Sequence, residues 1–191
     1  MKSRLFLLLA VLLAVAPLQI SRAQTAAPAT SWRDTITAQL PSLGQGNWIV
    51  IADSSYPWSA LPGMQTVITG ASGLDVLQAV LNSVGQVKNL RPVIYTENEI
   101  NYVTDKYAAG VTSYRGGLSQ AIGTRDKKVS SHDDLVRTIN QTAQSLHVLV
   151  LKTTQTLPYS TIYIQLENGN WSPEGEKAMK EAMSAAAAAK K

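Results

Sequence analysis

A continuous apolar run at residues 48–52 does most to limit the folds open to this chain, because it contains Ile and Val and no polar alternation. Such a run is typical of a strand that is covered on both faces, as in α/β folds. Asp53 follows it directly. Ligands of open α/β sheets bind outside the carboxyl ends of the strands, so Asp53 is a candidate site residue. It can equally tie the turn through Ser54 and Ser55, and the sequence leaves both roles open.

Helical and strand patterns alternate along the rest of the chain, which is typical of a layered α/β domain. A capping signal at Ser131 and Asp134 predicts a helix that carries Leu135, Ile139 and Leu146. The patterns also predict helices at residues 32–40, 74–84 and 100–107, and strands at residues 66–69, 92–96, 147–152 and 162–166. The glycine-rich segment at residues 110–130 yields no prediction of its elements.

The first residues have the features of a secretory signal peptide. Basic residues precede an apolar run at residues 5–15, and Ser21 and Ala23 are small residues of the kind that a signal peptidase reads. The apolar run is shorter than the roughly 20 residues that span a membrane, which favours export over a membrane anchor. We predict a signal peptide at residues 1–23, a flexible leader at residues 24–31, and a mature protein that is periplasmic or secreted. The membrane is then a partner only through the signal peptide.

Charge and cysteine content exclude several classes of protein. The full chain has 17 basic and 13 acidic residues, but three of the basic residues lie in the predicted signal peptide, so the mature chain keeps 14 and its net charge falls from +4 to +1. No cluster of Lys and Arg with interleaved aromatic residues remains, which argues against nucleic-acid binding. The chain has no cysteine, which excludes a disulfide scaffold and a thiolate metal site. Removing 23 of the 191 residues leaves 168, the length of one domain.

The end of the chain differs in composition from the rest. Ser172 and Pro173 are typical of a helix start, and the residues after them are rich in alanine with lysines at the end. We predict one domain at residues 32–171 and an Ala/Lys-rich helix at residues 172–191. The apolar face of this helix is mostly Ala and Met, so it can pack weakly on the domain or form an oligomer contact. The sequence does not choose between them.

Four segments of the chain share their order and nearly their spacing with one known family. They are LGQGNWIVIADSSYP at residues 43–57, the stretch that contains GLDVLQA at residues 69–96, SHDDL at residues 131–135, and LVLKTTQTLPYSTIYI at residues 149–164. Together they resemble the RbsD/FucU family of sugar mutarotases, that is, D-ribose pyranase and L-fucose mutarotase. The resemblance implies a three-layer α/β/α fold with a central, mostly parallel sheet. It also implies a homo-oligomer such as a ring, with sites between subunits.

The resemblance also implies roles for individual residues. Asp53 falls at the active-site aspartate of the family and Tyr159 at its tyrosine before the final strand, and both would contact the sugar. His132 matches a histidine near the pocket. The proposed acid/base histidine of the family, however, falls on Gln45, and an asparagine falls on Thr161.

The replacement of that histidine matters for the chemistry. Mutarotation opens and recloses a cyclic hemiacetal, so one group gives a proton to the ring oxygen and another removes one from the anomeric hydroxyl. An imidazole does either near neutral pH, whereas the amide of Gln45 can only hold a hydroxyl. With Asp53 as the base, the acid would be His132, Tyr159 or a water molecule.

Other chemistry-bearing residues have plainer interpretations. Tyr56 and Trp58 follow Asp53 in a loop, where their rings can stack on a pyranose or pack beneath the loop. Glu97 and Glu99 follow a strand and are interpreted as charging the first turn of the next helix. The two histidines are far apart and show no HxH or HExxH spacing, so no metal site is predicted, and no P-loop or GxGxxG indicates a cofactor.

Two functions from different classes fit these observations. The first is an exported sugar-recognising protein, a monosaccharide mutarotase with an altered active site. The second is a catalytically inactive binding or oligomeric assembly module of the same fold. For the first, the catalytic candidates are Asp53, His132 and Tyr159, and the substrate-binding candidates are Gln45, Tyr56, Trp58 and Thr161.

Overall fold

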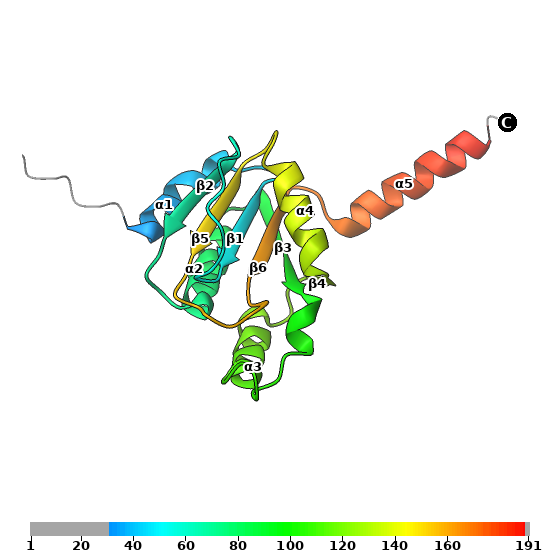
Figure 1. The fold of residues 1–191 in the computed structure, drawn as a ribbon. Helices are drawn as coiled ribbons and strands as arrows, with labels where there is room; N and C mark the ends of the chain where they lie inside the picture. The colour runs from blue at the N-terminus through cyan, green and yellow to red at the C-terminus, as the bar shows by residue number, and fades with distance from the viewer. Residues whose placement is uncertain (1–30, 190–191) are drawn as a thin grey trace, which may run out of the picture.

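The computed structural model describes residues 31–189, so the predicted signal peptide and all of the predicted leader except Ser31 lie outside it. Its centre is a six-stranded sheet in the order β2-β5-β1-β6-β3-β4 (Figure 1). The strands are β1 (Trp48–Ala52), β2 (Met64–Ile68), β3 (Leu90–Glu97), β4 (Lys127–Ser130), β5 (Val148–Lys152) and β6 (Ile162–Asn168). Only β6 runs antiparallel to its neighbours, β1 and β3, so the sheet is mostly parallel, as predicted.

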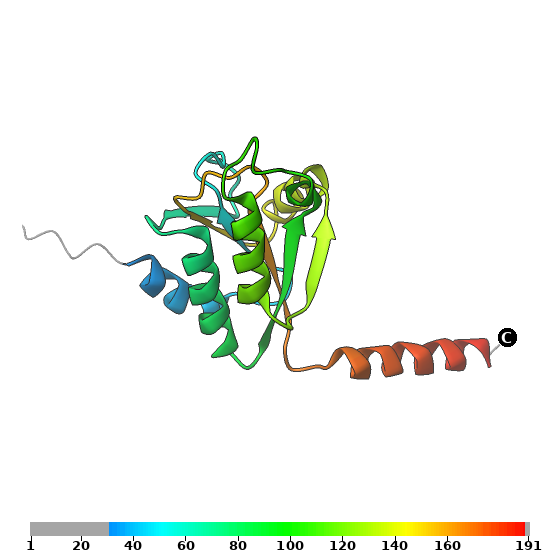
Figure 2. The same cartoon turned by 90° about the horizontal axis from the view of Figure 1, so that it is seen from below.

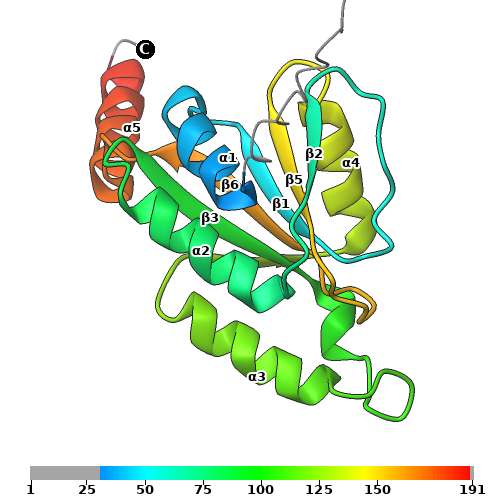
Figure 3. The same ribbon diagram turned by 90° about the vertical axis from the view of Figure 1, so that its left-hand side faces the viewer.

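Helices cover both faces of the sheet. They are α1 (Trp32–Gln39), α2 (Gly73–Gly85), α3 (Val111–Ile122), α4 (His132–Thr142) and α5 (Pro173–Ala188), with short 3-10 helices η1 (Leu40–Ser42) and η2 (Asn98–Asn101). Figure 3 shows α2 and α3 on one side of the sheet and α4 on the other. The three-layer α/β/α architecture is therefore confirmed.

Strand β1 shows how the sequence produces these layers. All five of its residues are buried. Ile49 and Ile51 face the cluster that includes α1, α2 and α3, whereas Trp48, Val50 and Ala52 face the cluster under α4. Side chains of a strand alternate between its two faces, so a strand between two helical layers must be apolar at every position. The interpretation of residues 48–52 is confirmed.

The start of α4 also agrees with the sequence. The Ser131 side chain accepts a hydrogen bond from the backbone N–H of Asp134, which satisfies one of the free donors at the first turn. The helix buries Leu135 and Ile139 against the sheet and ends at Thr142, so Leu146 lies beyond it. The length of this helix was overestimated by about one turn.

Two regions differ from the sequence analysis. The helix predicted at residues 100–107 is wrong: η2 ends at Asn101, and a loop follows in which Asp105 accepts hydrogen bonds from the backbone N–H groups of Gly110 and Thr112. An aspartate that binds backbone N–H groups ahead of it stabilises a turn and the start of the next helix, here α3. The glycine-rich segment, which had no prediction, forms α3 and the edge strand β4.

Helix α5 extends away from the rest of the chain (Figures 1 and 2), and none of its residues is buried. Its start is as predicted, with the Ser172 side chain capping the N–H of Gly175 and Pro173 in the first turn. Across residues 31–189, no helix combines the length and the apolar character that crossing a membrane requires.

Candidate active site

The candidate site lies at the carboxyl ends of the parallel strands. Asp53 follows β1, Glu97 ends β3, and His132 begins α4 directly after β4. Thr161 precedes β6, and because β6 is antiparallel its first residues lie at this same edge. Asp53, His132 and Thr161 line one cavity of about 340 Å³ together with Tyr56 and side chains of α4. The topology therefore brings together four of the seven predicted site residues.

Asp53 ties its turn and faces the cavity at once. Its Oδ1 accepts hydrogen bonds from the backbone N–H of Ser55 at 2.7 Å and from the Ser55 hydroxyl, and its Oδ2 accepts from the Thr161 hydroxyl at 3.0 Å. The Asx-turn interpretation is thus confirmed for Ser55 but not for Ser54, whose backbone N–H donates to the carbonyl of Gln155. The turn is compatible with a site role because the carboxylate is only partly buried and lines the cavity. These donors fix the direction in which the carboxylate points.

His132 is held by a buried carboxylate. Its Nδ1 lies 2.6 Å from Oε1 of Glu97, whose side chain is 1% exposed, and the hydroxyl of Tyr163 donates to the same oxygen at 2.9 Å. The backbone N–H of His132 donates to both carboxylate oxygens of Glu99, at 3.0 and 3.1 Å. With Glu97 ionised, Nδ1 carries the proton and Nε2 is the nitrogen left for a ligand.

The buried position of this cluster shifts the pKa of its acidic groups. Burial raises the pKa of Glu97, and the hydrogen bonds from His132 and Tyr163 partly oppose that rise. Burial, with smaller contributions from the charges of Glu97 and Asp53, raises the pKa of Tyr56 to about 12. The Tyr56 hydroxyl therefore keeps its proton at neutral pH and is a hydrogen-bond donor.

Tyr159 contacts the same histidine from the loop before β6. Its ring meets the His132 ring edge to face, with centroids 5.7 Å apart. Its φ is +55°, and it is the one non-glycine residue with positive φ among the described residues. The left-handed region costs an ordinary residue on the order of 1 kcal/mol, and such positions cluster at functional sites. This unfavourable backbone conformation makes Tyr159 a candidate functional residue.

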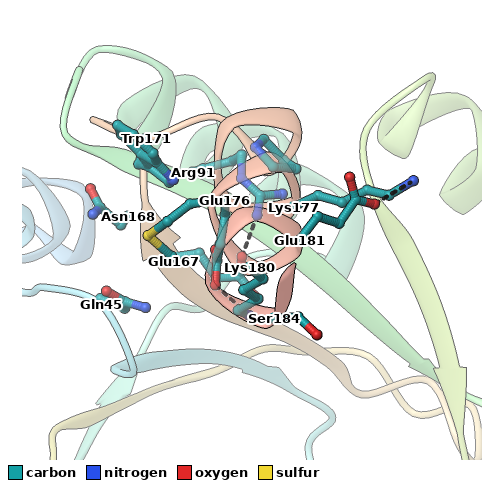
Figure 4. A pocket seen from close by; sticks show the side chains of 12 residues that line it. Gln45, Arg91, Glu167, Asn168, Trp171, Glu176, Lys177, Lys180, Glu181 and Ser184 are labelled. Atoms are coloured by element: carbon teal, nitrogen blue, oxygen red, sulfur yellow. Dashed lines mark hydrogen bonds and ion pairs between the residues drawn. The ribbon is translucent and has the colours of Figure 1, made fainter. Parts of the chain in front are cut away.

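Two predicted substrate-binding residues do not join this cavity. Gln45 lies before β1, at the opposite end of the strand from Asp53, and lines a groove beside α5 (Figure 4). The strand between them is five residues long, which corresponds to about 16 Å. Trp58 is 77% exposed and is not part of the cavity lining. Within one chain, β1 separates Gln45 from a ligand held by Asp53 and His132, whereas Trp58 lies between Pro57 and Ser59, which do line the cavity, with its own side chain outside the lining.

Glu97 is the site residue that the sequence analysis missed. It was interpreted as charging the first turn of a helix, and that is wrong, because it is the last residue of β3 and its side chain points into the molecule toward His132 and Tyr163. The signal that could have found it is the one that found Asp53: an acid at the carboxyl end of a buried strand. Glu99, by contrast, does lie in a first turn, that of η2.

No group of three or more His, Cys, Asp or Glu side chains that could hold a metal ion occurs among the residues that the structure describes.

The fold and the site define a class: a three-layer α/β/α domain with a carboxylate and a carboxylate-held histidine at the carboxyl edge of its sheet. No family model matches the chain, and no curated protein matches it. Among solved structures, it is similar to Bacillus subtilis RbsD complexed with D-ribose, with 16% identity, a TM-score of 0.47, and coverage of 73% of this chain and 96% of that one.

Two further solved structures have comparable similarity. For FucU from Bifidobacterium longum the identity is 15%, the TM-score 0.45, and the coverage 69% of this chain and 91% of that one. For the fucose mutarotase in complex with L-fucose from Streptococcus pneumoniae, the identity is 15%, the TM-score 0.43, and the coverage 71% and 91%. These are proteins of the RbsD/FucU type, the family that the sequence motifs resemble. At such low identities and TM-scores, a function for this chain has to be derived from its own side chains.

Proposed function

We propose that the cavity binds a monosaccharide in its ring form and interconverts its anomers. The observation that carries the proposal is that His132, which lines the cavity together with Asp53, is held from behind by the buried Glu97, with Nδ1 and Oε1 2.6 Å apart. A carboxylate that holds one imidazole nitrogen leaves the other free to give or take a proton near neutral pH. The sequence resemblance to sugar mutarotases supports the choice of reaction.

The reaction needs one acid and one base. Asp53 would remove the proton of the anomeric hydroxyl while the imidazolium form of His132, with a proton on each ring nitrogen, gives its Nε2 proton to the ring oxygen. The bond between the anomeric carbon and the ring oxygen breaks, and the open aldehyde forms, with the proton now on Asp53 and the neutral imidazole ready for the reverse transfers. Rotation about the next carbon–carbon bond and the reverse proton transfers close the ring as the other anomer. Glu97 would hold His132 in the orientation and tautomer that this transfer requires.

The size and lining of the cavity support a single sugar ring as the ligand. Its volume of about 340 Å³ lies at the small end of ligand sites, which run from roughly 300 to 1,000 Å³. Its lining combines hydrogen-bonding groups of Asp53, Asn140 and Thr161 with the ring of Tyr56. Sugars offer hydroxyls to the former and an apolar ring face to the latter. Tyr159 does not line the cavity, but its ring lies against that of His132, and its hydroxyl would reach the sugar from there.

The test is anomer exchange measured by saturation-transfer NMR with ribose, fucose, galactose and glucose. We expect the protein to accelerate exchange for one of them, and His132→Gln to lose about 10²- to 10⁴-fold of that acceleration. The matched control is His147→Gln, which removes the other histidine of the chain, directly before β5. Exchange at the uncatalysed rate with every sugar would overturn the proposal.

Asp53→Asn separates a site role from a turn-tying role. Asn keeps an oxygen that accepts the Ser55 hydrogen bonds, and the Thr161 hydroxyl can rotate to accept from the new amide. We therefore expect sugar binding and exchange to weaken while the melting temperature stays near the wild-type value. A lower melting temperature with unchanged sugar binding would show that Asp53 only stabilises the turn.

The second candidate is a sugar-binding or assembly module without catalysis. What favours it is Gln45, which stands where the resembled family has its acid/base histidine. A homo-oligomer, for example a ring, is the arrangement in which Gln45 of one copy would approach the cavity of another. Binding without accelerated exchange would select this candidate. For both candidates, the predicted signal peptide supports a periplasmic or secreted location, which fractionation of expressing cells would test.

A further inference from the structure

The turn that carries Tyr159 is fixed by the residues around it. It spans residues 157–160, with proline at its second position and the positive φ of Tyr159 at its third, where type II turns usually have glycine. The Ser160 hydroxyl donates to the carbonyl of Leu157 at 2.6 Å. Ser160 and Thr161 are 4% and 3% exposed, whereas Tyr159 is 41% exposed. The position of the Tyr159 ring is therefore determined by its buried neighbours more than by its own burial.

A buried hydroxyl from the opposite helical layer holds the end of this turn. Tyr114 belongs to α3, on the face of the sheet opposite α4 (Figure 3), and is 6% exposed. Its hydroxyl donates to the carbonyl of Ser160 at 2.8 Å, a contact between residues 46 apart in sequence. Burial, with smaller contributions from the charges of Glu97 and Asp53, raises the pKa of Tyr114 above its ordinary value of 10. The hydroxyl therefore keeps its proton at neutral pH and remains a donor.

Packing alone does not require a hydroxyl at position 114. The Tyr114 ring belongs to the apolar cluster that includes α1, α2 and α3, where a phenylalanine ring would pack equally well. A buried hydroxyl costs free energy unless it is hydrogen-bonded, so its partner explains why it is tolerated. That partner is the carbonyl of Ser160, the residue directly after Tyr159. The bond therefore restrains the backbone next to the residue with the unfavourable conformation.

We propose that Tyr114 is a positioning residue of the candidate site, whose hydroxyl keeps the turn in the conformation that places the Tyr159 ring against His132. The two rings meet edge to face, with centroids 5.7 Å apart. Without the bond from Tyr114, the turn can relieve the positive φ of Tyr159, which is unfavourable for any residue with a side chain, and the ring leaves His132. The consequence for sugar chemistry rests on the proposed function, whereas the position of the ring does not.

The test uses the NMR signals of the histidine ring protons in the full chain, purified as the cell processes it. The chain has two histidines, so His147→Gln identifies the signals of His132. A neighbouring aromatic ring shifts these signals, and Tyr159→Ala gives their positions without that ring. We expect Tyr114→Phe to move the His132 signals most of the way toward those of Tyr159→Ala. His132 signals that stay in place in folded Tyr114→Phe would overturn the proposal.

The matched control is Tyr95→Phe. It also removes a tyrosine hydroxyl from a hydrogen bond, but that hydroxyl donates to Gln165 on β6, at 3.0 Å, and not to the turn. We expect the His132 signals of this variant to match those of the wild type, and circular dichroism to show that both variants are folded. A shift in Tyr95→Phe as large as that in Tyr114→Phe would make the effect a general one and contradict the positioning role.

A double variant shows whether Tyr114 acts through Tyr159. In the Tyr159→Ala background, Tyr114→Phe should cause no further shift of the His132 signals, because no ring remains to be positioned. A further shift of the same size would assign the effect to another route and refute the proposal.

Anomer exchange gives a readout that depends on the proposed function. Tyr114→Phe should slow exchange by no more than Tyr159→Ala does, and the double variant should be as slow as Tyr159→Ala alone. Losses that multiply in the double variant would contradict a role through Tyr159. If the wild type accelerates exchange of no sugar, the proposed function fails, whereas the His132 signals still decide whether Tyr114 positions Tyr159.

Discussion

At the scale of single residues, Glu97 shows two opposite effects on one carboxyl group. Burial disfavours its charge, and the hydrogen bonds from His132 and Tyr163 favour it; burial is the larger effect, so its pKa is raised. Such a group holds a proton more tightly in the folded chain than in the unfolded one. It thereby links the stability of the whole domain to pH.

We predict that Glu97→Gln flattens this pH dependence. A raised pKa in the folded state means that the stabilising contribution is complete below the ordinary value of 4.5 and is lost as pH rises through the higher pKa of the folded state. Gln keeps an acceptor oxygen for Tyr163 and cannot ionise. Melting temperatures measured from pH 4 upward should therefore fall less steeply in the variant than in the wild type. The exposed Glu174→Gln is the control, and parallel profiles for Glu97→Gln and wild type would refute the linkage.

Tyr159 gives a second prediction at this scale. Tyr159→Phe keeps the ring against His132 and the same backbone conformation, so the melting temperature should stay within about a degree of wild type. If the hydroxyl bonds the sugar, its loss costs about 0.5–1.5 kcal/mol, a roughly 2- to 12-fold weaker affinity measured by titration calorimetry. Tyr107→Phe, which alters an 80% exposed tyrosine in the loop before α3, should have no effect. Equal affinity of Tyr159→Phe and wild type would remove the hydroxyl from the site.

At the scale of elements, sequence patterns predicted those helices and strands that depend on residues close in sequence. The run at residues 48–52 and the cap at Ser131 depend on neighbours in sequence, and β1 and α4 form where they indicated. The helix expected at residues 100–107 failed because Asp105 binds backbone groups that come later in the chain. Apolar residues at helical spacing could not reveal that competing turn. Strand β4 was not predicted because it is a short, largely exposed edge strand with little apolar pattern.

Two adjacent glycines in α3 give a matched pair of substitutions. A Cβ at Gly116 would meet nothing within 4 Å, whereas a Cβ at Gly117 would lie 2.7 Å from Cδ1 of Leu74 on α2. We expect Gly116→Ala to stabilise the protein by about 0.5–1 kcal/mol, because alanine restricts the unfolded chain. Gly117→Ala should gain less or lose stability, since Leu74 must move. Denaturant titrations of both variants check this, and equal gains would mean that Leu74 repacks freely.

At the scale of the whole molecule, the strand topology brings some of the predicted site residues together and separates another from them. The antiparallel β6 returns Thr161 to the edge where β1 delivers Asp53, a juxtaposition of residues 108 apart that no local pattern contains. The sequence motifs predicted Asp53, His132 and Thr161 as site residues, and these three line one cavity. The same matching could not reveal that Gln45 lies at the other end of β1, because a motif records order along the chain and not direction through the sheet.

The last prediction concerns how Gln45 acts if it belongs to the site at all. Within one chain, a histidine at position 45 cannot touch a sugar held by Asp53, because β1 separates the two. Gln45→His should therefore raise anomer exchange only in assembled protein, and the rate per chain should fall on dilution. The double variant Gln45→His, Asp53→Asn lacks a working cavity of its own but can offer its imidazole to a wild-type neighbour. Mixed with wild type and allowed to exchange subunits, it should raise the total rate above that of the wild type alone. A mixture that only dilutes the wild-type rate would show that Gln45 lies outside the site in the assembly as it does in the single chain.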